Sequence, residues 1–276
     1  MTYRNNSAAM NLSGDSTMRG ILIPLEMARV QALLPHGLKL GKQTLTPAGT
    51  HPVMLFFNDI FRGHLSIPTL IPNLTYHEFH IGIPFTYLAG NGPYYYMARL
   101  YLDQLLPILG GRFFWGLPKE MASITVSAGT VFQTAAYTYT VTSPAGYPVA
   151  SLSWQMTVSD FQVPTKAAYF SPILQILSQT LVSRLPAAVG PIYILSDFDK
   201  MWTAPTARVG SISTRILMDG ELMIPNPVPG QPAPEWIQGL ASGNLFGAFE
   251  LRVPWRLSLP YPPQSRSSVF AQSWYS

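Results

Sequence analysis

The sequence contains no cysteine and carries little charge. The missing cysteine excludes disulfides, thiolate catalysis and cysteine-based metal sites. A chain without disulfides fits the cytoplasm, which is the location we expect. Charged residues make up 11% of the 276 residues, against about 25% in a typical soluble domain. Apolar subunit contacts are the simplest way to cover so weakly charged a surface, and we therefore expect a homo-oligomer.

Several other classes of function lack their usual signals. The net charge of +4 comes from scattered basic residues without a run of like charge, so we expect no nucleic-acid partner. No stretch reaches about 18 apolar residues, and the N-terminus has no apolar core of a signal peptide, so we expect no membrane partner. The five histidines lack zinc spacing, and phosphate-loop and dinucleotide motifs are missing. We therefore expect neither a metal nor a cofactor.

Proline and glycine, with 26 and 21 residues, divide the chain into short segments rich in β-branched and aromatic residues. This pattern predicts a mainly β fold (α+β). The predicted strands are 53–61, 76–88, 94–102, 122–143, 151–158, 208–218 and 249–259. The clearest hairpin joins 134–143 to 149–158 around the turn PAGYP.

Three segments have the apolar spacing and end signals of helices, namely 25–35, 171–185 and 233–243. In the second, Ser171 is the expected N-cap and Pro172 lies in the first turn. We expect a single domain over 18–261. The flanking segments 1–17 and 262–276 are rich in small polar residues and proline, and we expect them to be loosely ordered.

Lys119 is the lysine with the most apolar surroundings in the sequence. It directly follows the run FFWGLP, residues 113–118. A lysine held in an apolar site loses hydration of its ammonium form, so its pKa falls and a free amine becomes available to attack a ketone. The alternative is a lysine at a strand end whose amine reaches water. The spacing alone favours this alternative.

Glu78 lies in the middle of a predicted strand among aromatic residues, in TYHEFHIGIPF. An acid in that position is either buried with a partner or points into a cavity. The alternative is the exposed face of an edge strand, and the residues alone leave both interpretations open. His77 and His80 cannot share a face of this strand because their separation is odd.

Four segments in order resemble acetoacetate decarboxylases. YLDQLLPILGGRFFWGLPKEMA (101–122) is similar to the lysine-bearing segment of that family, and TYHEFHIGIPFTY (75–87) to the segment with an active-site glutamate. MWTAPTARV (201–209) and VQALLPHGLKL (30–40) resemble two further segments. The resemblance covers about residues 18 to 260.

The resemblance implies a cone-like antiparallel β-barrel with a few peripheral helices, homo-oligomers and a small-molecule keto substrate. It also implies a Schiff-base lysine at Lys119 and an acid at Glu78 in the same cavity. We expect Tyr76 and Trp115 to contact the substrate there. In this reading the apolar run before Lys119 lowers the lysine pKa by desolvation.

The sequence departs from the family pattern at three positions. Glu120 replaces the lysine that follows the reactive one, and strand alternation predicts that it faces away from the cavity. Phe56 replaces a second glutamate, which makes the expected pocket more apolar. Arg19 lies about three residues from the place of the arginine that handles the substrate carboxylate in the family, and it is our candidate for that role.

These observations predict a Schiff-base lyase or decarboxylase acting on a keto acid or a related keto compound. Two alternatives stay open. One is an imine-dependent aldolase, dehydratase or cyclase of a biosynthetic pathway that releases no CO2, which the departures at Phe56 and Arg19 favour. The other is a barrel that binds a hydrophobic small molecule without catalysis.

Overall fold

The computed structural model describes residues 11–65, 73–131, 134–146, 148–156, 171–185, 192–200, 206–216 and 248–263. Along the chain the elements are β1 (Asn11–Glu26), α1 (Met27–Leu33), β2 (Leu38–Leu40), β3 (Thr50–Leu65), β4 (Leu74–Leu88), β5 (Asn91–Leu102), α2 (Leu105–Trp115), β6 (Lys119–Met121), β7 (Ser123–Val131), β8 (Thr134–Thr142), β9 (Pro148–Met156), α3 (Ser171–Leu177), β10 (Thr180–Leu185), β11 (Ile192–Ser196), β12 (Phe198–Lys200), β13 (Thr206–Ile216) and β14 (Ala248–Ser258). None of the helices in these ranges is long and apolar enough to cross a membrane.

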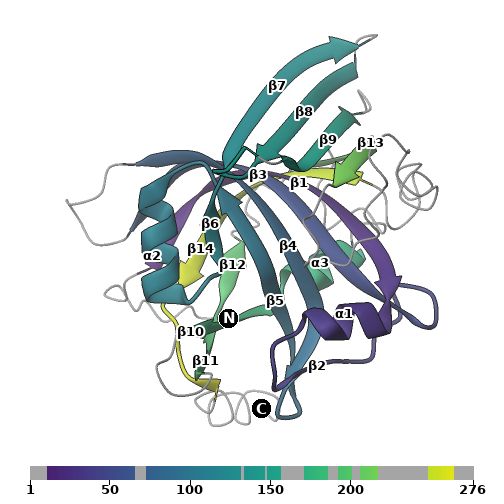
Figure 1. The fold of residues 1–276 in the computed structure, drawn as a ribbon, viewed down its shortest axis with the longest axis vertical. Coiled ribbons are helices and arrows are strands. Elements are labelled where there is room, and N and C mark those ends of the chain that lie inside the picture. Colours follow the sequence, from purple (N-terminus) through teal and green to yellow (C-terminus); the bar gives the residue numbers. More distant parts are fainter. Residues whose placement is uncertain are drawn as a thin grey trace.

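One curled sheet organises the molecule (Figure 1). Its strands follow the order β11-β10-β5-β4-β3-β1-β14-β13-β9-β8-β7. β12 pairs with β14, and the backbones of Leu195 and Tyr261 exchange hydrogen bonds of 2.8 and 2.9 Å. These contacts bring the β11 end of the sheet back to β14 and form a half-barrel. The predicted mainly β fold is confirmed, although β5 pairs in parallel with both β6 and β10.

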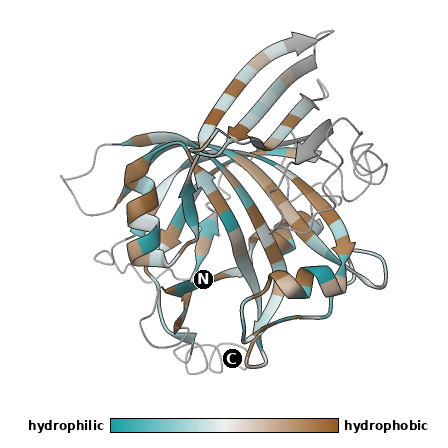
Figure 2. Ribbon diagram, in the orientation of Figure 1, coloured by the Kyte–Doolittle hydropathy of each residue, from teal (hydrophilic) through white to brown (hydrophobic). Residues whose placement is uncertain are grey.

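Alternation along the strands sorts the apolar side chains into two cores. On β1, Met18 and Leu22 join one buried cluster, whereas Ile21 and Ile23 join the other. Figure 2 shows hydrophobic residues recurring along the strands and on α2. Neighbouring residues of a strand point to opposite faces. The cluster that contains Met18 also receives side chains from α2, α3 and β14, and it surrounds the cavity described below.

The strands β7, β8 and β9 extend away from the rest of the sheet as an antiparallel arm (Figure 1). The predicted hairpin is confirmed as β8 and β9, with Tyr137 opposite Trp154. The predicted single strand 122–143 is instead two strands, β7 and β8, which pair with each other. The connection at 132–133 reads Phe-Gln and has none of the glycine or proline that usually marks a turn, so the sequence pattern did not reveal it.

The helix predicted over 171–185 is wrong in its second half. Helix α3 ends at Leu177, and residues 180–185 form β10, which pairs in parallel with β5 and antiparallel with β11. Sheet pairing on both sides overrides the helical spacing of the apolar residues. The predicted helix at 25–35 is present as the shorter α1, while the one at 233–243 lies outside the described residues.

Two of the longer elements, β1 and α2, were not expected from the sequence. Residues 11–17, expected to be loosely ordered, belong to β1, which pairs with β3 on one side and β14 on the other. These two partners supply backbone hydrogen bonds that a polar composition does not reveal. Helix α2 contains Gly110 and Gly111, which lower helix propensity, so this segment gave only a weak helical signal. Residues 1–10 and 264–276 lie outside the described ranges.

Candidate active site

The turn from α2 into β6 positions Lys119. Helix α2 ends at Gly116, whose φ of 56° is in the left-handed region that favours glycine. The Leu117 N–H donates to the Gly111 carbonyl at 3.1 Å and closes the helix end. The chain then enters β6, where Lys119 lies beside Leu100 of β5. As a result Lys119 is 3% exposed.

Three hydrogen bonds anchor the end of α2 and the start of β6. Arg112 Nε donates to the Lys119 carbonyl at 2.5 Å. Trp115 Nε1 donates to the Ser258 carbonyl of β14 at 2.7 Å, and Ser183 Oγ of β10 donates to the Trp115 carbonyl at 2.5 Å. The backbone that carries the lysine is therefore tied to two other strands of the half-barrel.

Gly111 leaves the space in which the Lys119 side chain runs. A Cβ atom at residue 111 would lie 2.4 Å from both Cδ and Cε of Lys119, far inside normal contact distance. The Nζ atom lies 5.9 Å from the centre of the Tyr76 ring. Among the described residues no hydrogen-bond partner lies within reach of Nζ.

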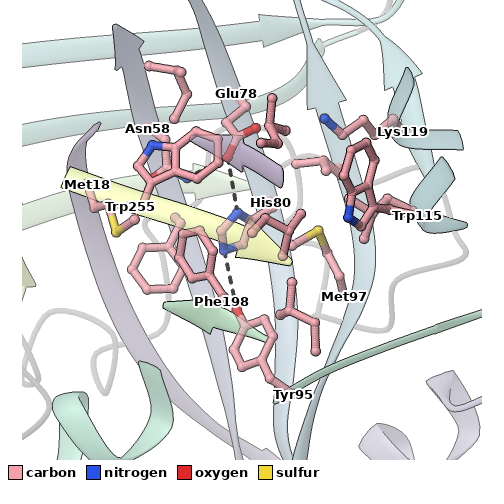
Figure 3. A pocket seen from close by; sticks show the side chains of 18 of the residues that line it. Met18, Asn58, Glu78, His80, Tyr95, Met97, Trp115, Lys119, Phe198 and Trp255 are labelled. Carbon is pink, nitrogen blue, oxygen red and sulfur yellow. Dashed lines mark hydrogen bonds and ion pairs between the residues drawn. The ribbon is translucent and has the colours of Figure 1, made fainter. Parts of the chain in front are cut away.

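The Lys119 side chain ends in a cavity of about 80 Å³ inside the half-barrel (Figure 3). Most of its walls are apolar. The polar side chains among its lining residues are Asn58, Tyr76, Glu78, His80, Tyr95, Lys119 and Gln179, together with the indoles of Trp115 and Trp255. A wider hollow of about 440 Å³ along α2 shares Leu12, Tyr76, Gly111 and Trp115 with this cavity.

Lys119 and Glu78 influence each other's protonation. Burial lowers the pKa of the Lys119 amine, and the Glu78 charge offsets only part of that effect. Burial raises the pKa of Glu78, but His80, the Lys119 charge and a hydrogen bond from Asn58 together bring it below its usual value. The cavity therefore holds a carboxylate beside an amine whose proton is weakly held.

A row of polar side chains crosses β3, β4 and β5 at this cavity (Figure 3). Asn58 Nδ2 donates to Glu78 Oε1 at 2.7 Å. His80 Nδ1 lies 3.8 Å from Glu78 Oε1, an ion-pair distance rather than a hydrogen bond. His80 Nε2 lies 3.3 Å from the Tyr95 hydroxyl. The sequence analysis did not select His80, although its separation of two from Glu78 places both on one strand face.

The structure brings five of the six predicted site residues together. Lys119, Glu78, Phe56, Tyr76 and Trp115 all line the cavity. Besides His80, the sequence analysis missed the lining residues Asn58, Tyr95 and Gln179. Gln179 lies in the turn between α3 and β10, inside the segment that was predicted to be one helix, so the direction of its side chain could not be inferred.

Arg19, the sixth predicted site residue, does not reach the cavity. Its neighbour Met18 lines the cavity, and strand alternation turns Arg19 to the opposite face of β1. There its guanidinium donates to Asp59 at 2.6 Å and to Glu250 at 2.9 Å. The expected contact between Arg19 and a substrate carboxylate is therefore wrong for this structure.

Glu120 faces away from the cavity, as strand alternation predicted. Its carboxylate accepts a hydrogen bond from Arg99 at 3.3 Å on the outer side of β6. The acid that follows the lysine is thus paired elsewhere and does not contact the amine. No group of three or more His, Cys, Asp or Glu residues suited to a metal ion occurs in the described ranges.

Comparison with known proteins agrees with this fold. The family model "Acetoacetate decarboxylase (ADC)" matches residues 2–190. A crystal structure of acetoacetate decarboxylase from Legionella pneumophila superposes with a TM-score of 0.58 at 15% identity, covering 92% of this chain and 87% of that one. An acetoacetate decarboxylase-like enzyme from Sphingomonas wittichii RW1 gives a TM-score of 0.58 at 14% identity, covering 92% and 93%.

The enduracididine biosynthesis enzyme MppR, solved with the condensation product of pyruvate and imidazole 4-carboxaldehyde, is also similar. Its TM-score is 0.56 at 15% identity, and the match covers 91% of this chain and 88% of MppR. The comparison with curated proteins found no match. At these identities the solved structures establish the fold alone. The family model spans more than half of the sequence, and the chain therefore belongs to the acetoacetate decarboxylase family.

Proposed function

We propose that this protein is a Schiff-base-forming lyase that acts on a keto acid or a related keto compound through Lys119. The observation that carries the proposal is the position of the Lys119 amine, buried in a mainly apolar cavity beside the Glu78 carboxylate. Family membership supports an enzyme of this kind. Acetoacetate decarboxylase is itself a known case of a lysine activated by its surroundings.

The reaction begins when the free amine of Lys119 adds to the substrate carbonyl. The carbinolamine formed by this addition takes up a proton and loses water, which gives a protonated imine that attracts electrons from the neighbouring carbon. In a decarboxylation, the bond to the carboxylate breaks, CO2 leaves, and its electron pair passes into the imine to form an enamine. The enamine takes up a proton on carbon, and water then releases the ketone and regenerates the amine.

Glu78 is the residue we assign to proton transfer and to charge balance. Its carboxylate stabilises the protonated imine, because opposite charges in a site of low polarity attract strongly. In this proposal Glu78 also takes a proton from the bound substrate or returns one to it. Phe56, Tyr76 and Trp115 line the cavity and would contact the substrate and keep water away from the imine.

A second candidate is an imine-dependent aldolase, dehydratase or cyclase that releases no CO2. Two observations favour it: Arg19 lies outside the cavity, and Phe56 lines the cavity where the resemblance places a second acid. MppR, a neighbour in fold, was solved with the condensation product of pyruvate and imidazole 4-carboxaldehyde, which supports this candidate. In the retro-aldol direction, a base removes the β-hydroxyl proton, the carbon–carbon bond breaks, and its electrons form the enamine as an aldehyde leaves.

Borohydride trapping with a panel of keto acids and ketones tests the proposal. Reduction of an imine adds the substrate mass irreversibly to one lysine, which peptide mass spectrometry locates. We expect the adduct at Lys119 in the wild-type protein and no adduct in Lys119→Arg. Lys39→Arg, at an exposed position of β2, is the control and should still be labelled at Lys119. Measuring CO2 and aldehyde release with the same panel separates the two reactions.

A result that leaves Lys119 unmodified by every ketone in folded protein would overturn the imine mechanism. If Lys119→Arg also kept full biological activity, a non-catalytic barrel that binds hydrophobic small molecules would be the better account. The cytoplasmic location expected from the composition also stays a proposal, and cell fractionation tests it.

A further inference from the structure

The Lys119 cavity offers one group that can become a cation to balance its one carboxylate. Of the lining residues that the structure describes, Lys119 is the single lysine or arginine, and Glu78 is the single acid. The arginine nearest in sequence to the expected carboxylate contact, Arg19, is occupied by Asp59 and Glu250 on the other face of β1. Once Lys119 becomes a protonated imine, Glu78 neutralises it.

A substrate carboxylate would add a second anion to this cavity without adding a cation. An anion moved from water into an apolar site loses its hydration, and the loss is repaid only by a paired charge and hydrogen bonds. The nearby Glu78 carboxylate, whose pKa lies below its usual value, would repel it further. The described charges therefore disfavour a keto acid.

Three polar atoms of the cavity walls lack a hydrogen-bond partner within the described part of the chain. They are Asn58 Oδ1, His80 Nδ1 and Gln179 Nε2, and all three side chains are more than nine-tenths buried. Buried polar atoms almost always have partners, so three atoms without a hydrogen bond around one cavity indicate a ligand that supplies one. Of the three, His80 Nδ1 also lies at ion-pair distance from Glu78. Together they offer one acceptor, one donor and one ring nitrogen that can act as either.

The other polar atom of each side chain is already used, which fixes the direction of these groups. Asn58 Nδ2 donates to Glu78, and His80 Nε2 lies within hydrogen-bond distance of Tyr95. Gln179 Oε1 accepts the Phe85 backbone N–H at 2.8 Å. The amides of Asn58 and Gln179 therefore cannot be turned over without losing these bonds, so an acceptor and a donor remain available at the cavity.

We propose that the Lys119 cavity takes an uncharged ketone or aldehyde that carries a hydroxyl or amide group, and that Asn58, His80 and Gln179 bind this group. The inference rests on the proposed imine function and defines its substrate class. A neutral group that both donates and accepts satisfies the three unpaired atoms without bringing a second anion next to Glu78. A β-hydroxy ketone has this chemistry and is a substrate for carbon–carbon cleavage without loss of CO2.

Two matched ketones test, in the wild-type protein, whether the cavity prefers an uncharged substrate. Levulinate and levulinamide have the same carbon chain. Levulinate ends in a charged carboxylate, whereas levulinamide ends in a neutral amide. We expect borohydride to trap levulinamide on Lys119 on the order of tenfold faster than levulinate, because an unpaired buried charge costs more than one factor of ten in binding. Equal or faster trapping of levulinate on Lys119 would overturn the inference while leaving the imine function intact.

A second pair of ketones tests whether the cavity binds a hydroxyl group on the substrate. In 4-hydroxy-2-butanone a hydroxyl takes the place of the terminal methyl of 2-pentanone. We expect the wild-type protein to favour the hydroxy ketone severalfold at Lys119, and Gln179→Met to remove most of that preference while 2-pentanone is still trapped. Gln175→Met, at an exposed position of α3, serves as the control and should keep the preference.

Each outcome points to one conclusion. Adducts at Lys119 without any preference for the neutral or hydroxylated ketone contradict the substrate class alone. Failure of all four ketones to label Lys119 contradicts the proposed imine function itself. Because Gln179 also holds the Phe85 backbone, the thermal unfolding of Gln179→Met is measured as well, and the wild-type comparison decides the question if that variant does not fold.

Discussion

At the scale of single residues, the cavity has two opposing effects on the pKa of Lys119. Burial among apolar side chains disfavours the ammonium form, and the Glu78 carboxylate favours it. Because burial is the larger effect, the pKa of the amine lies below its ordinary value. In the proposed mechanism this balance supplies a reactive amine and a counter-charge for the protonated imine.

Glu78→Gln should lower the pKa of Lys119 further. The change removes the charge that raises this pKa and keeps the size of the side chain, so the amine should lose its proton at a pH lower by on the order of one unit. The pH dependence of Lys119 acylation by an activated ester, followed by peptide mass spectrometry, measures the shift. Glu120→Gln is the matched control, because Glu120 pairs with Arg99 away from the cavity, and it should leave the profile unchanged.

Arg19 has a structural role on the other face of β1. Its guanidinium bridges the buried carboxylates of Asp59 and Glu250. Arg19→Met should reduce the free energy of unfolding by about 3–5 kcal/mol, because two buried anions lose the cation that bridges them. In Arg62→Met, which breaks an ion pair whose arginine side chain is 73% exposed, the loss should be about 0–1 kcal/mol. Urea unfolding of both variants checks the contrast, and equal losses would contradict this role.

The sequence predicted which residues belong to the site better than it predicted the direction in which their side chains point. Lys119 and Glu78 were found from an isolated lysine, a strand acid and a family resemblance, and both line the cavity. Arg19 was misplaced because a shift of one residue along a strand moves a side chain to the other face. His80 was missed because its separation of two from Glu78 places it at the cavity only once Glu78 is known to face the cavity.

At the scale of elements, α2 places the lysine through its glycines. Gly110 and Gly111 are adjacent in sequence, yet their surroundings differ. A Cβ at Gly111 would meet the Lys119 side chain at 2.4 Å, whereas a Cβ at Gly110 meets nothing within 4 Å. The helix therefore has room for a side chain at residue 110, whereas at residue 111 a side chain would collide with Lys119.

Gly111→Ala should displace the Lys119 amine and reduce imine formation at least tenfold, since a misplaced reacting group costs orders of magnitude in rate. The fold should survive, because the flexible end of a lysine can move. In Gly110→Ala, imine formation should be unchanged and the free energy of unfolding should rise by about 0.5–1 kcal/mol. Borohydride trapping rates and thermal unfolding of both variants test this difference. Equal trapping rates in the two variants would contradict the close contact between residue 111 and the Lys119 side chain.

Most strands could be predicted from alternation and from proline and glycine signals, but segments shaped by distant pairing could not. The apolar spacing of 171–185 is compatible with a helix, and only the pairing of β10 with β5 and β11 makes its second half a strand. Helix α2 was hidden by its two glycines and Pro107. In each case the deciding contacts come from residues far away in the sequence.

At the scale of the whole molecule, α2 carries an apolar outer surface. Its large exposed side chains are Leu105, Leu106, Leu109, Phe113 and Phe114, with Phe113 78% exposed. Together with the low charge of 11%, this surface supports the proposal that the protein is a homo-oligomer in which a second copy covers α2. Large exposed apolar patches are typical of protein interfaces.

Phe113→Glu should shift the protein to a smaller species, because a charge in an apolar interface loses its hydration. Met27→Glu is the control on α1, where a single apolar side chain is 43% exposed, and it should leave the assembly unchanged. Size-exclusion chromatography with light scattering measures both masses. A wild-type protein that runs as a monomer at micromolar concentration would contradict the proposed assembly.

The central claim is that the half-barrel holds Lys119 as an amine with a lowered pKa. The most direct test follows the acylation rate of Lys119 with pH in the wild-type protein, with N-acetyl-lysine amide in the same solution as the reference. The account predicts that Lys119 reaches half of its maximal reactivity well below the ordinary lysine value of about 10.4. A midpoint at or above that of the reference would contradict it.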